Sequence, residues 1–381
     1  MKKFDVIVIG SGSGGEIVES ALSHNFSVAW VDKGPLGGTC LNVGCIPSKM
    51  LIYPADRIVE IQEAKKFGIK ADIKEVDFNL IMKHMREPII ESHEHMEKGI
   101  HNTEDFTYYK GMGHFISNYT IKINDGEIQG KKIFIGSGAR PLIPDIKGIE
   151  DIDYLTNENV FDLTKKPESI SIIGGGYIAV EFAHFFAAIG TKVTIFQRGD
   201  RLITPSEPEI SDLLFKQMKK RMDIFTNIEV YEFIKKENGC MVLGKNKNTG
   251  EEKKVNSEKI LIATGRKSNA DLLRVENTGV KTDKRGYVLV NEYLETSKKN
   301  IWAFGDAIGK FMFKHVANEE AIIAWNNALH GKKTKMDYSA VPYAAFTYPQ
   351  IAAVGLTEKQ ARENHKILVG DYGKSKIPIL Q

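Results

Sequence analysis

Residues 4–22 read FDVIVIGSGSGGEIVESAL, and this stretch decides the fold. Its opening residues form a β-branched apolar run, which is typical of a buried parallel strand. A glycine turn and apolar positions at helical spacing follow, and the next apolar run ends at Asp32. The turn matches G-x-G-x-x-G through Gly10, Gly12 and Gly15. Together these features predict a dinucleotide cradle, because the glycines let the backbone approach a pyrophosphate while the acid reaches a ribose hydroxyl. A tight turn without a ligand is the alternative.

A second stretch of the same kind lies further along the chain. A buried strand is predicted over 169–173, a helix from about Tyr177 to Ile189, and another strand over 192–196. The turn after the first strand matches G-x-G-x-x-A through Gly174, Gly176 and Ala179. Two dinucleotide cradles in one chain indicate electron transfer between two bound dinucleotides.

The residue at the end of the second strand of this cradle decides which nicotinamide cofactor fits. An acid there would bind the 2′-hydroxyl of NAD and repel the 2′-phosphate of NADP. The sequence instead places neutral Gln197 there, followed by Arg198 and Arg201. Arginine binds phosphate through charge-assisted hydrogen bonds, so the sequence favours NADPH over NADH. Solvated surface arginines remain the alternative.

Residues 37–49, GGTCLNVGCIPSK, hold two of the three cysteines, Cys40 and Cys45. This spacing allows a small disulfide ring, and the small uncharged neighbours let a flat partner approach the sulfurs. An apolar periodic stretch follows, so Cys45 is expected at the N-terminus of a helix, where the helix dipole stabilises a thiolate. A metal site would need further ligands, and Cys240 is the only other thiol. The pair is therefore predicted to be reactive, with structural burial as the alternative.

This stretch resembles the redox-active disulfide of the FAD-dependent pyridine nucleotide-disulfide oxidoreductases, which include dihydrolipoamide dehydrogenase, glutathione reductase, mycothione reductase and mercuric reductase. The resemblance covers Phe4 to about Gly373. It is greatest to the mycothione reductase branch, through the phrases CIPSKM, EFAHFFAAIG, ATGRKSNADLL, KHVANEEA and FTYPQIAAVGLTE. Mercuric reductase is expected less, because the sequence shows no N-terminal cysteine-rich metal-binding domain.

The resemblance implies an α/β fold with two Rossmann-like domains, each of three layers (ββα). Residues 1–150 and 266–335 would form an FAD-binding domain, 151–265 an NAD(P)-binding domain, and 336–381 the start of an α+β dimerisation domain. Family members continue beyond this point and carry a His–Glu pair that serves as acid–base for the attacking cysteine. His365 does not match that pattern, so the sequence is expected to be a fragment, and a shortened, catalytically impaired protein is the alternative.

The resemblance also assigns roles to residues. The catalytic set would be Cys40, Cys45, Lys49, Tyr177 and Glu181. The FAD site would comprise Gly10, Gly12, Gly14, Gly15, Asp32, Lys33, Gly38, Thr39, Ser137, Gly138, Asp306, His315 and Ala317. The NAD(P) site would comprise Gly174, Gly176, Tyr177, Ile178, Gln197, Arg198 and Gly265.

Several of these roles are specific. Tyr177 would lie over the flavin as a gate, and Glu181 would pair with Lys49 beside it, since a buried charge is costly without a partner. Asp306 would bind a ribityl hydroxyl from a strand end. Ser137 stands where the family usually has threonine, and the helix opening at His315 would turn its dipole toward the flavin. The alternatives are an exposed Glu181 and a helix-capping Asp306.

The expected activity is transfer of electrons from NADPH or NADH through FAD to the Cys40–Cys45 disulfide, with Cys45 nearer the flavin and Cys40 attacking a small-molecule disulfide or lipoyl substrate. A homodimer is expected. Two alternatives remain: a dihydrolipoamide dehydrogenase that uses NAD, and a non-catalytic FAD-binding protein.

Composition sets wider limits. The chain has 381 residues, 42% of them apolar and 27% charged, which suggests two or three domains. Its 52 basic and 49 acidic residues give a net charge of +3, and no basic stripe predicts a nucleic-acid partner. No apolar run is long enough to span a membrane, and the N-terminal apolar run ends at Gly10, so no signal peptide and a cytoplasmic location are expected.

Further expectations concern local structure, the histidines and the third cysteine. Residues 56–105 have helical periodicity, and the histidines within them are expected on a solvated face rather than at a metal. Residues 106–135 predict a small antiparallel excursion, and Asn248 to Gly250 a hairpin turn. Cys240 lies in a charge-rich stretch and is expected to be an exposed bystander.

Overall fold

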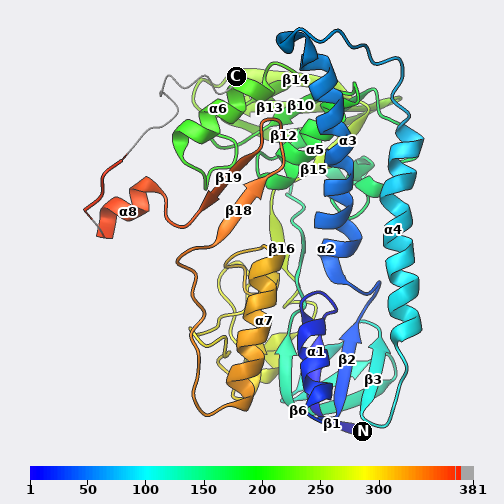
Figure 1. The fold of residues 1–381 in the computed structure, drawn as a ribbon, viewed down its shortest axis with the longest axis vertical. Coiled ribbons are helices and arrows are strands. Elements are labelled where there is room, and N and C mark those ends of the chain that lie inside the picture. The colour runs from blue at the N-terminus through cyan, green and yellow to red at the C-terminus, as the bar shows by residue number, and fades with distance from the viewer. Residues whose placement is uncertain (365, 370–381) are drawn as a thin grey trace.

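The computed structural model describes residues 1–364 and 366–369, so His365 and the end of the resemblance near Gly373 lie outside it. Figure 1 shows two α/β units that follow one another along the long axis of the molecule. The helices are α1 (Gly14–Ser23), α2 (Gly38–Val43), α3 (Cys45–Glu63), α4 (Phe78–Gly99), α5 (Tyr177–Ala188), α6 (Pro208–Met218), α7 (Lys314–Leu329) and α8 (Glu358–Asn364).

The first unit is built on a seven-stranded sheet in which β17 pairs with β6 beside the path β3-β2-β1-β6-β5-β4. The central pairs β1–β2, β1–β6 and β6–β17 are parallel, as buried apolar strands joined by crossovers should be. Helices α1 and α7 belong to this unit (Figure 1). Its strands are β1 (Lys2–Ile9), β2 (Val28–Asp32), β3 (Phe106–Lys110), β4 (His114–Ser117), β5 (Thr120–Ile123), β6 (Gly126–Ile135) and β17 (Ile301–Ala303).

The predicted antiparallel excursion is confirmed for β4, β5 and β6, which pair antiparallel in sequence order. It is wrong for β3, which pairs parallel with β2. The reason is the connection: the chain leaves β2, passes through the long helices α3 and α4, and returns to the same edge in the same direction.

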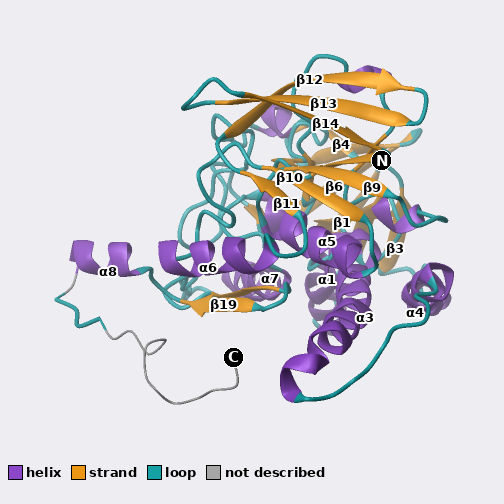
Figure 2. Ribbon diagram, turned by 90° about the horizontal axis from the view of Figure 1, so that it is seen from above, coloured by secondary structure: helices purple, strands orange, loops and turns teal. Residues whose placement is uncertain are grey.

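The second unit has a five-stranded parallel sheet of order β11-β10-β9-β15-β8. A three-stranded antiparallel sheet, β12-β13-β14, covers one face, and helices cover the other (Figure 2). This is the three-layer ββα arrangement that the resemblance implies. The strands are β8 (Tyr154–Leu155), β9 (Ser169–Ile173), β10 (Lys192–Phe196), β11 (Asp223–Phe225), β12 (Ile228–Lys236), β13 (Gly239–Asn246), β14 (Glu252–Ser257) and β15 (Lys259–Ile262).

The expectation that Cys240 is exposed is wrong, because Cys240 lies in the antiparallel layer. This cysteine is buried, at 4% exposure, because it lies on the central strand β13 and packs with Phe233 and Ile260. Alternate residues of a strand face opposite sides, so a charge-rich stretch can still bury every second side chain. The predicted turn at Asn248 to Gly250 is confirmed and joins β13 to β14.

The two glycine turns close their sheets in the same way. Gly10 has a φ of 102°, and a Cβ there would collide with the carbonyl of Gly136 at the end of β6. Gly174 has a φ of 125° and stands in the same relation to the carbonyl of Ala263 after β15. Only glycine tolerates both constraints, so each fingerprint is first a packing requirement between neighbouring strand ends.

The stretch 56–105, predicted to have helical periodicity, contains the end of α3 and all of α4. Helix α3 ends at Glu63, and α4 begins where the Asp77 side chain accepts a hydrogen bond from the Leu80 amide at 2.9 Å. His84, His95 and His101 are exposed, as expected. His93 is not simply solvated, because its Nε2 hydrogen-bonds the Asn42 side chain on α2.

Helices α3 and α4 connect the units. Although they follow the first cradle in sequence, their apolar faces share a core with α5 of the second unit, through residues such as Leu51, Met82 and Phe182. Two small antiparallel sheets of two strands each lie outside these larger sheets: β7 (Ala139–Pro141) pairs with β16 (Arg266–Ser268), and β18 (Pro342–Ala345) pairs with β19 (Ile351–Val354). Within the residues described, no helix is both long and apolar enough to cross a membrane.

Candidate active site between the two units

A cavity of about 2710 Å³ lies where the two units and α3 meet. Most residues of the predicted sites line it, including both cysteines of the close pair, Lys49, Tyr177, Glu181 and Asp306. Five predicted residues do not line it: Gly14, Gly15, Gly174, Gln197 and Arg198. The cavity is large enough for an extended ligand, and its walls come from both halves of the chain.

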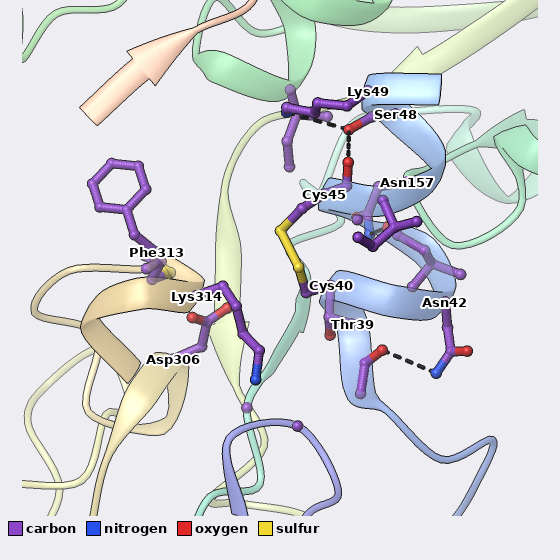
Figure 3. Close-up of a pocket in the computed structure, with 18 of the residues that line it drawn as sticks. Thr39, Cys40, Asn42, Cys45, Ser48, Lys49, Asn157, Asp306, Phe313 and Lys314 are labelled. Carbon is purple, nitrogen blue, oxygen red and sulfur yellow. Dashed lines mark hydrogen bonds between the residues drawn. A yellow bond between two sulfur atoms is a disulfide. The ribbon is translucent and has the colours of Figure 1, made fainter. Parts of the chain in front are cut away.

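Cys40 and Cys45 form a disulfide at this cavity (Figure 3). Cys40 lies in α2, and Cys45 is the first residue of α3, as the sequence predicts. Gly44 makes the sharp junction possible, since a Cβ there would lie 2.7 Å from the Thr39 carbonyl oxygen. Once reduced, a Cys45 thiolate would lie at the positive end of the α3 dipole.

Lys49 and Glu181 form the ion pair that the resemblance implies, with Nζ 2.6 Å from Oε2. Glu181 is 7% exposed, so the alternative of an exposed helix residue is wrong. Its second oxygen accepts a hydrogen bond from the Phe346 amide at 3.1 Å. Both carboxylate oxygens are therefore satisfied, which is the condition for burying this charge.

Tyr177 opens α5 and faces two aromatic rings, with centroid distances of 5.8 Å to Phe313 and 6.1 Å to Tyr343. Burial, together with the neighbouring Tyr343, raises the pKa of the Tyr177 phenol well above its usual value. The phenol is therefore neutral at physiological pH. The ring stands at the boundary between the second glycine turn and the first unit.

Asp32 is in the predicted place, but backbone amides already bind its carboxylate. Its oxygens accept hydrogen bonds from Ser11 N at 2.5 Å and Gly34 N at 2.6 Å. Asp32 therefore fixes the glycine turn as well as lining the cavity. Any ribose hydroxyl would use the remaining lone pairs of this carboxylate.

Asp306 follows β17 in a 3₁₀ turn, and its Oδ2 lies 3.2 Å from Arg266 Nε. Burial raises the pKa of Asp306, while Arg266 opposes the shift. The residue before α7 is Phe313, so the alternative in which Asp306 caps that helix is wrong. The carboxylate faces the cavity across from the disulfide (Figure 3).

The remaining predicted residues divide into two groups. The Ser137 hydroxyl is buried in the wall without a hydrogen-bond partner in the described structure, which suits a polar ligand. His315 and Ala317 lie in the first turns of α7 and line the cavity. Gln197 instead turns back to donate to the Arg201 carbonyl at 3.0 Å, and Arg198 is exposed outside the cavity.

The comparisons with known proteins agree with this geometry. The family model for pyridine nucleotide-disulphide oxidoreductases matches residues 4–321. The chain belongs to this family. Its relatives include a mercuric reductase from Staphylococcus aureus, 36% identical over 366 residues, which cover 94% of this chain and 66% of the relative. They also include a mycothione reductase from Mycobacterium tuberculosis, 34% identical over 387 residues, covering 98% of this chain and 83% of the relative.

Other members of the family extend the comparison. A dihydrolipoyl dehydrogenase from Chlamydia pneumoniae is 30% identical over 370 residues, covering 96% of this chain and 78% of the relative. The solved structure of the HOCl-induced flavoprotein disulfide reductase RclA from Escherichia coli has a TM-score of 0.83 at 29% identity, covering 94% of this chain and 79% of that one. This chain spans about two thirds of the length of the first mercuric reductase.

Two features of this family member were missed from the sequence. Lys314, the first residue of α7, lines the cavity and donates to Ser13 at 3.1 Å. Phe313 beside it packs against Tyr177. The resemblance placed a helix start at His315, but sequence spacing could not show that this start meets the first glycine turn. Among the described residues, no cluster of three His, Cys, Asp or Glu side chains could hold a metal ion.

Proposed function

We propose that the protein is a flavoprotein disulfide reductase that carries electrons from NADPH, through FAD, to the Cys40–Cys45 disulfide and on to a small-molecule disulfide. The observation that carries this proposal is the disulfide itself, which opens into the same cavity as Lys49, Tyr177 and Asp306. The family match supports the reaction class.

The described residues fit FAD. The glycine turn at Gly10 and Gly12, the ribose-side Asp32 and the ribityl-side Asp306 would hold it along the cavity. The buried Ser137 hydroxyl would gain the hydrogen-bond partner that it lacks. Bound there, FAD would supply two-electron transfer between the nicotinamide and the disulfide.

The chain's own groups then have defined tasks. The dipole of α3 stabilises the Cys45 thiolate, and the Lys49 ammonium, held by Glu181, adds positive charge beside it. The Cys40 thiolate would attack the substrate disulfide, releasing one substrate thiolate and forming a mixed disulfide. Attack by Cys45 on that mixed disulfide would release the second thiolate and re-form the Cys40–Cys45 bond.

We further propose the domain boundaries 1–150 with 266–335 for FAD, 151–265 for the nicotinamide nucleotide, and 336–381 for the start of a dimerisation domain. The fused core of α3 with α5 supports a close link between the first two. A homodimer in the cytoplasm is part of the same proposal. The β18–β19 hairpin supports a separate element after residue 335.

NADPH is proposed as the electron donor on the strength of Arg198 and Arg201, which follow Gln197 where an acid would favour NAD. Arg198 is exposed and so is available to a phosphate. A dihydrolipoyl dehydrogenase reaction with NAD is the alternative that a relative's name suggests. The mercuric reductases among the relatives make Hg(II) a second candidate acceptor for the reduced cysteine pair.

The test is an anaerobic titration of the FAD-loaded protein with NADPH and, separately, NADH, while the visible spectrum is followed. NADPH should produce a long-wavelength band in the wild-type protein and in Cys240→Ser, but not in Cys45→Ser. Cys40→Ser should lose NADPH-dependent reduction of disulfides. Flavin bleaching without the band, or full disulfide turnover by Cys40→Ser, would overturn the proposal. A strong preference for NADH would contradict the proposed role of Arg198 in binding NADPH. Turnover with Hg(II) but with no disulfide would show that Hg(II), and not a small-molecule disulfide, is the substrate.

A further inference from the structure

Lys314 is a half-buried lysine whose charge has no carboxylate partner among the described residues. Its Nζ donates to the Ser13 hydroxyl at 3.1 Å, and no ion pair to it is present in residues 1–364 and 366–369. Burial lowers the pKa of the Lys314 ammonium, and only the more distant, exposed Glu16 opposes this. A half-buried ammonium without a counter-ion is costly, so the site is incomplete without an anion.

The helix ends beside this ammonium add positive rather than compensating charge. Lys314 is the first residue of α7, and Ser13 immediately precedes α1, so the ammonium lies where two helix N-termini meet. The Ser13 side chain does not cap α1; its hydroxyl donates instead to Asn318 at 2.7 Å. The Ser13 hydroxyl therefore does not occupy the first amides of α1, the groups that an anion at a helix N-terminus would use.

The same residues line the cavity. Ser13, Lys314 and Asn318 lie in its wall together with Gly12 of the glycine turn. Figure 3 shows the Lys314 side chain extending into the cavity from α7, which lies across the cavity from the helices that carry the disulfide. An anion bound at the glycine turn would thus meet backbone amides from one side and the Lys314 ammonium from the other.

We propose that Lys314 is a diphosphate-binding residue, which clamps the anionic centre of the bound dinucleotide between α7 and the first glycine turn. This inference rests on the proposed FAD site and adds a residue to it from outside the glycine fingerprint. Through this lysine, α7 would bind the diphosphate of the cofactor by electrostatic attraction. The hydrogen bond to Ser13 aims the ammonium at the turn before the cofactor arrives.

The test measures FAD binding to apoprotein by quenching of flavin fluorescence, which does not depend on turnover. Lys314→Met should weaken FAD binding roughly tenfold to a hundredfold, the loss expected for a charge-assisted hydrogen bond. Lys314→Arg should retain most of the affinity. The matched control is Lys284→Met, which removes an exposed lysine that does not line the cavity, and it should bind FAD like wild type.

Two further measurements separate charge from a merely structural role. FAD affinity of the wild type should fall with added salt, and this slope should be smaller in Lys314→Met, because one phosphate contact is lost. Asn318→Ala breaks the hydrogen-bond chain through Ser13 but leaves the ammonium, so it should cost less affinity than Lys314→Met and keep the salt slope.

Equal FAD affinity in wild type and Lys314→Met would overturn the proposal, as would equal losses in Lys314→Met and Asn318→Ala with an unchanged salt slope. Thermal unfolding of each apoprotein shows whether a variant still folds. If Lys314→Met does not fold, the FAD affinity and salt slope of Lys314→Arg still test the proposal. If the wild-type protein binds no FAD at all, the proposed function fails as well, and this outcome is distinct from a failure of Lys314 alone.

Discussion

Lys49 Nζ lies 2.6 Å from Glu181 Oε2, and each residue stands one turn after the start of its own helix. The ion pair therefore joins the first turn of α3, which begins at Cys45, to the first turn of α5, which begins at Tyr177. Because both helix starts open into the cavity, this contact sets the disulfide and the second glycine turn side by side.

Glu181→Gln should destabilise the protein by about 1–2 kcal/mol, because Lys49 loses its counter-ion while remaining only partly exposed. The glutamine can still accept from the Phe346 amide, so the loss reports the charge. Urea unfolding measures it, and Glu209→Gln at an exposed position of α6 is the control. An unchanged midpoint would show that the pair contributes nothing to stability.

Glu320 should make stability depend on pH. This residue is fully buried on α7, where it accepts hydrogen bonds from Tyr338 and the Gly305 amide. Burial raises its pKa from 4.5 to about 7, partly offset by those hydrogen bonds and Lys310 and reinforced by Asp306. The native state therefore holds a proton that the unfolded state releases between these two values.

Stability should accordingly fall as pH rises from about 4.5 to about 7 and level off above that, with Glu320 accounting for up to roughly 3 kcal/mol. The glutamine of Glu320→Gln can accept from the Gly305 amide and donate to the Tyr338 hydroxyl, but it cannot titrate. The difference in unfolding free energy between variant and wild type should therefore change across this window. Urea unfolding at several pH values measures it. A constant difference would contradict the raised pKa.

Arg221 should hold His184 neutral. The imidazole is fully buried on α5, with Nδ1 3.0 Å from Arg221 and Nε2 2.8 Å from Asp56. Burial and the Arg221 charge lower the pKa of His184, against the pull of Asp56. Arg221→Met should raise that pKa in an NMR titration and cost about 3 kcal/mol of stability, since Arg221 also donates to the Tyr348 carbonyl. The exposed Arg285→Met is the control.

Gly174→Ala should disable the second cradle alone. The added Cβ would meet the Ala263 carbonyl, and the φ of 125° is strained for alanine. FAD should still bind, because the first glycine turn is untouched, while reduction of bound FAD by NADPH should slow by at least about tenfold. Stopped-flow absorbance measures this rate. Loss of FAD binding in Gly174→Ala would show that the two cradles are not independent.

The sequence was sufficient for the features that local chemistry determines. The glycine turns at Gly10 and Gly174, the strands beside them and the helix start at Cys45 all follow from residue type and period, and the structure confirms them. The pairing of Lys49 with Glu181 came from resemblance, because no local rule joins residues so far apart in the chain.

Contacts between distant segments explain the misses. Cys240 is buried because β13 is the central strand of a layer that packs on the parallel sheet, which charge content alone could not reveal. Likewise, β3 is parallel because of the crossover through α3 and α4. His93 reaches Asn42 and Lys314 reaches Ser13 only once the helices that carry them are packed in place.

The burial of Cys240 gives the molecule a simple chemical readout. Burial also raises the pKa of its thiol, so under native conditions a polar alkylating reagent should leave this sulfur unmodified. Every alkyl group incorporated would then come from the opened Cys40–Cys45 bond, the only other source of thiols in the sequence. Mass spectrometry of the alkylated native protein would therefore give the fraction of molecules in which the Cys40–Cys45 disulfide is reduced. No residue needs to be replaced for this measurement.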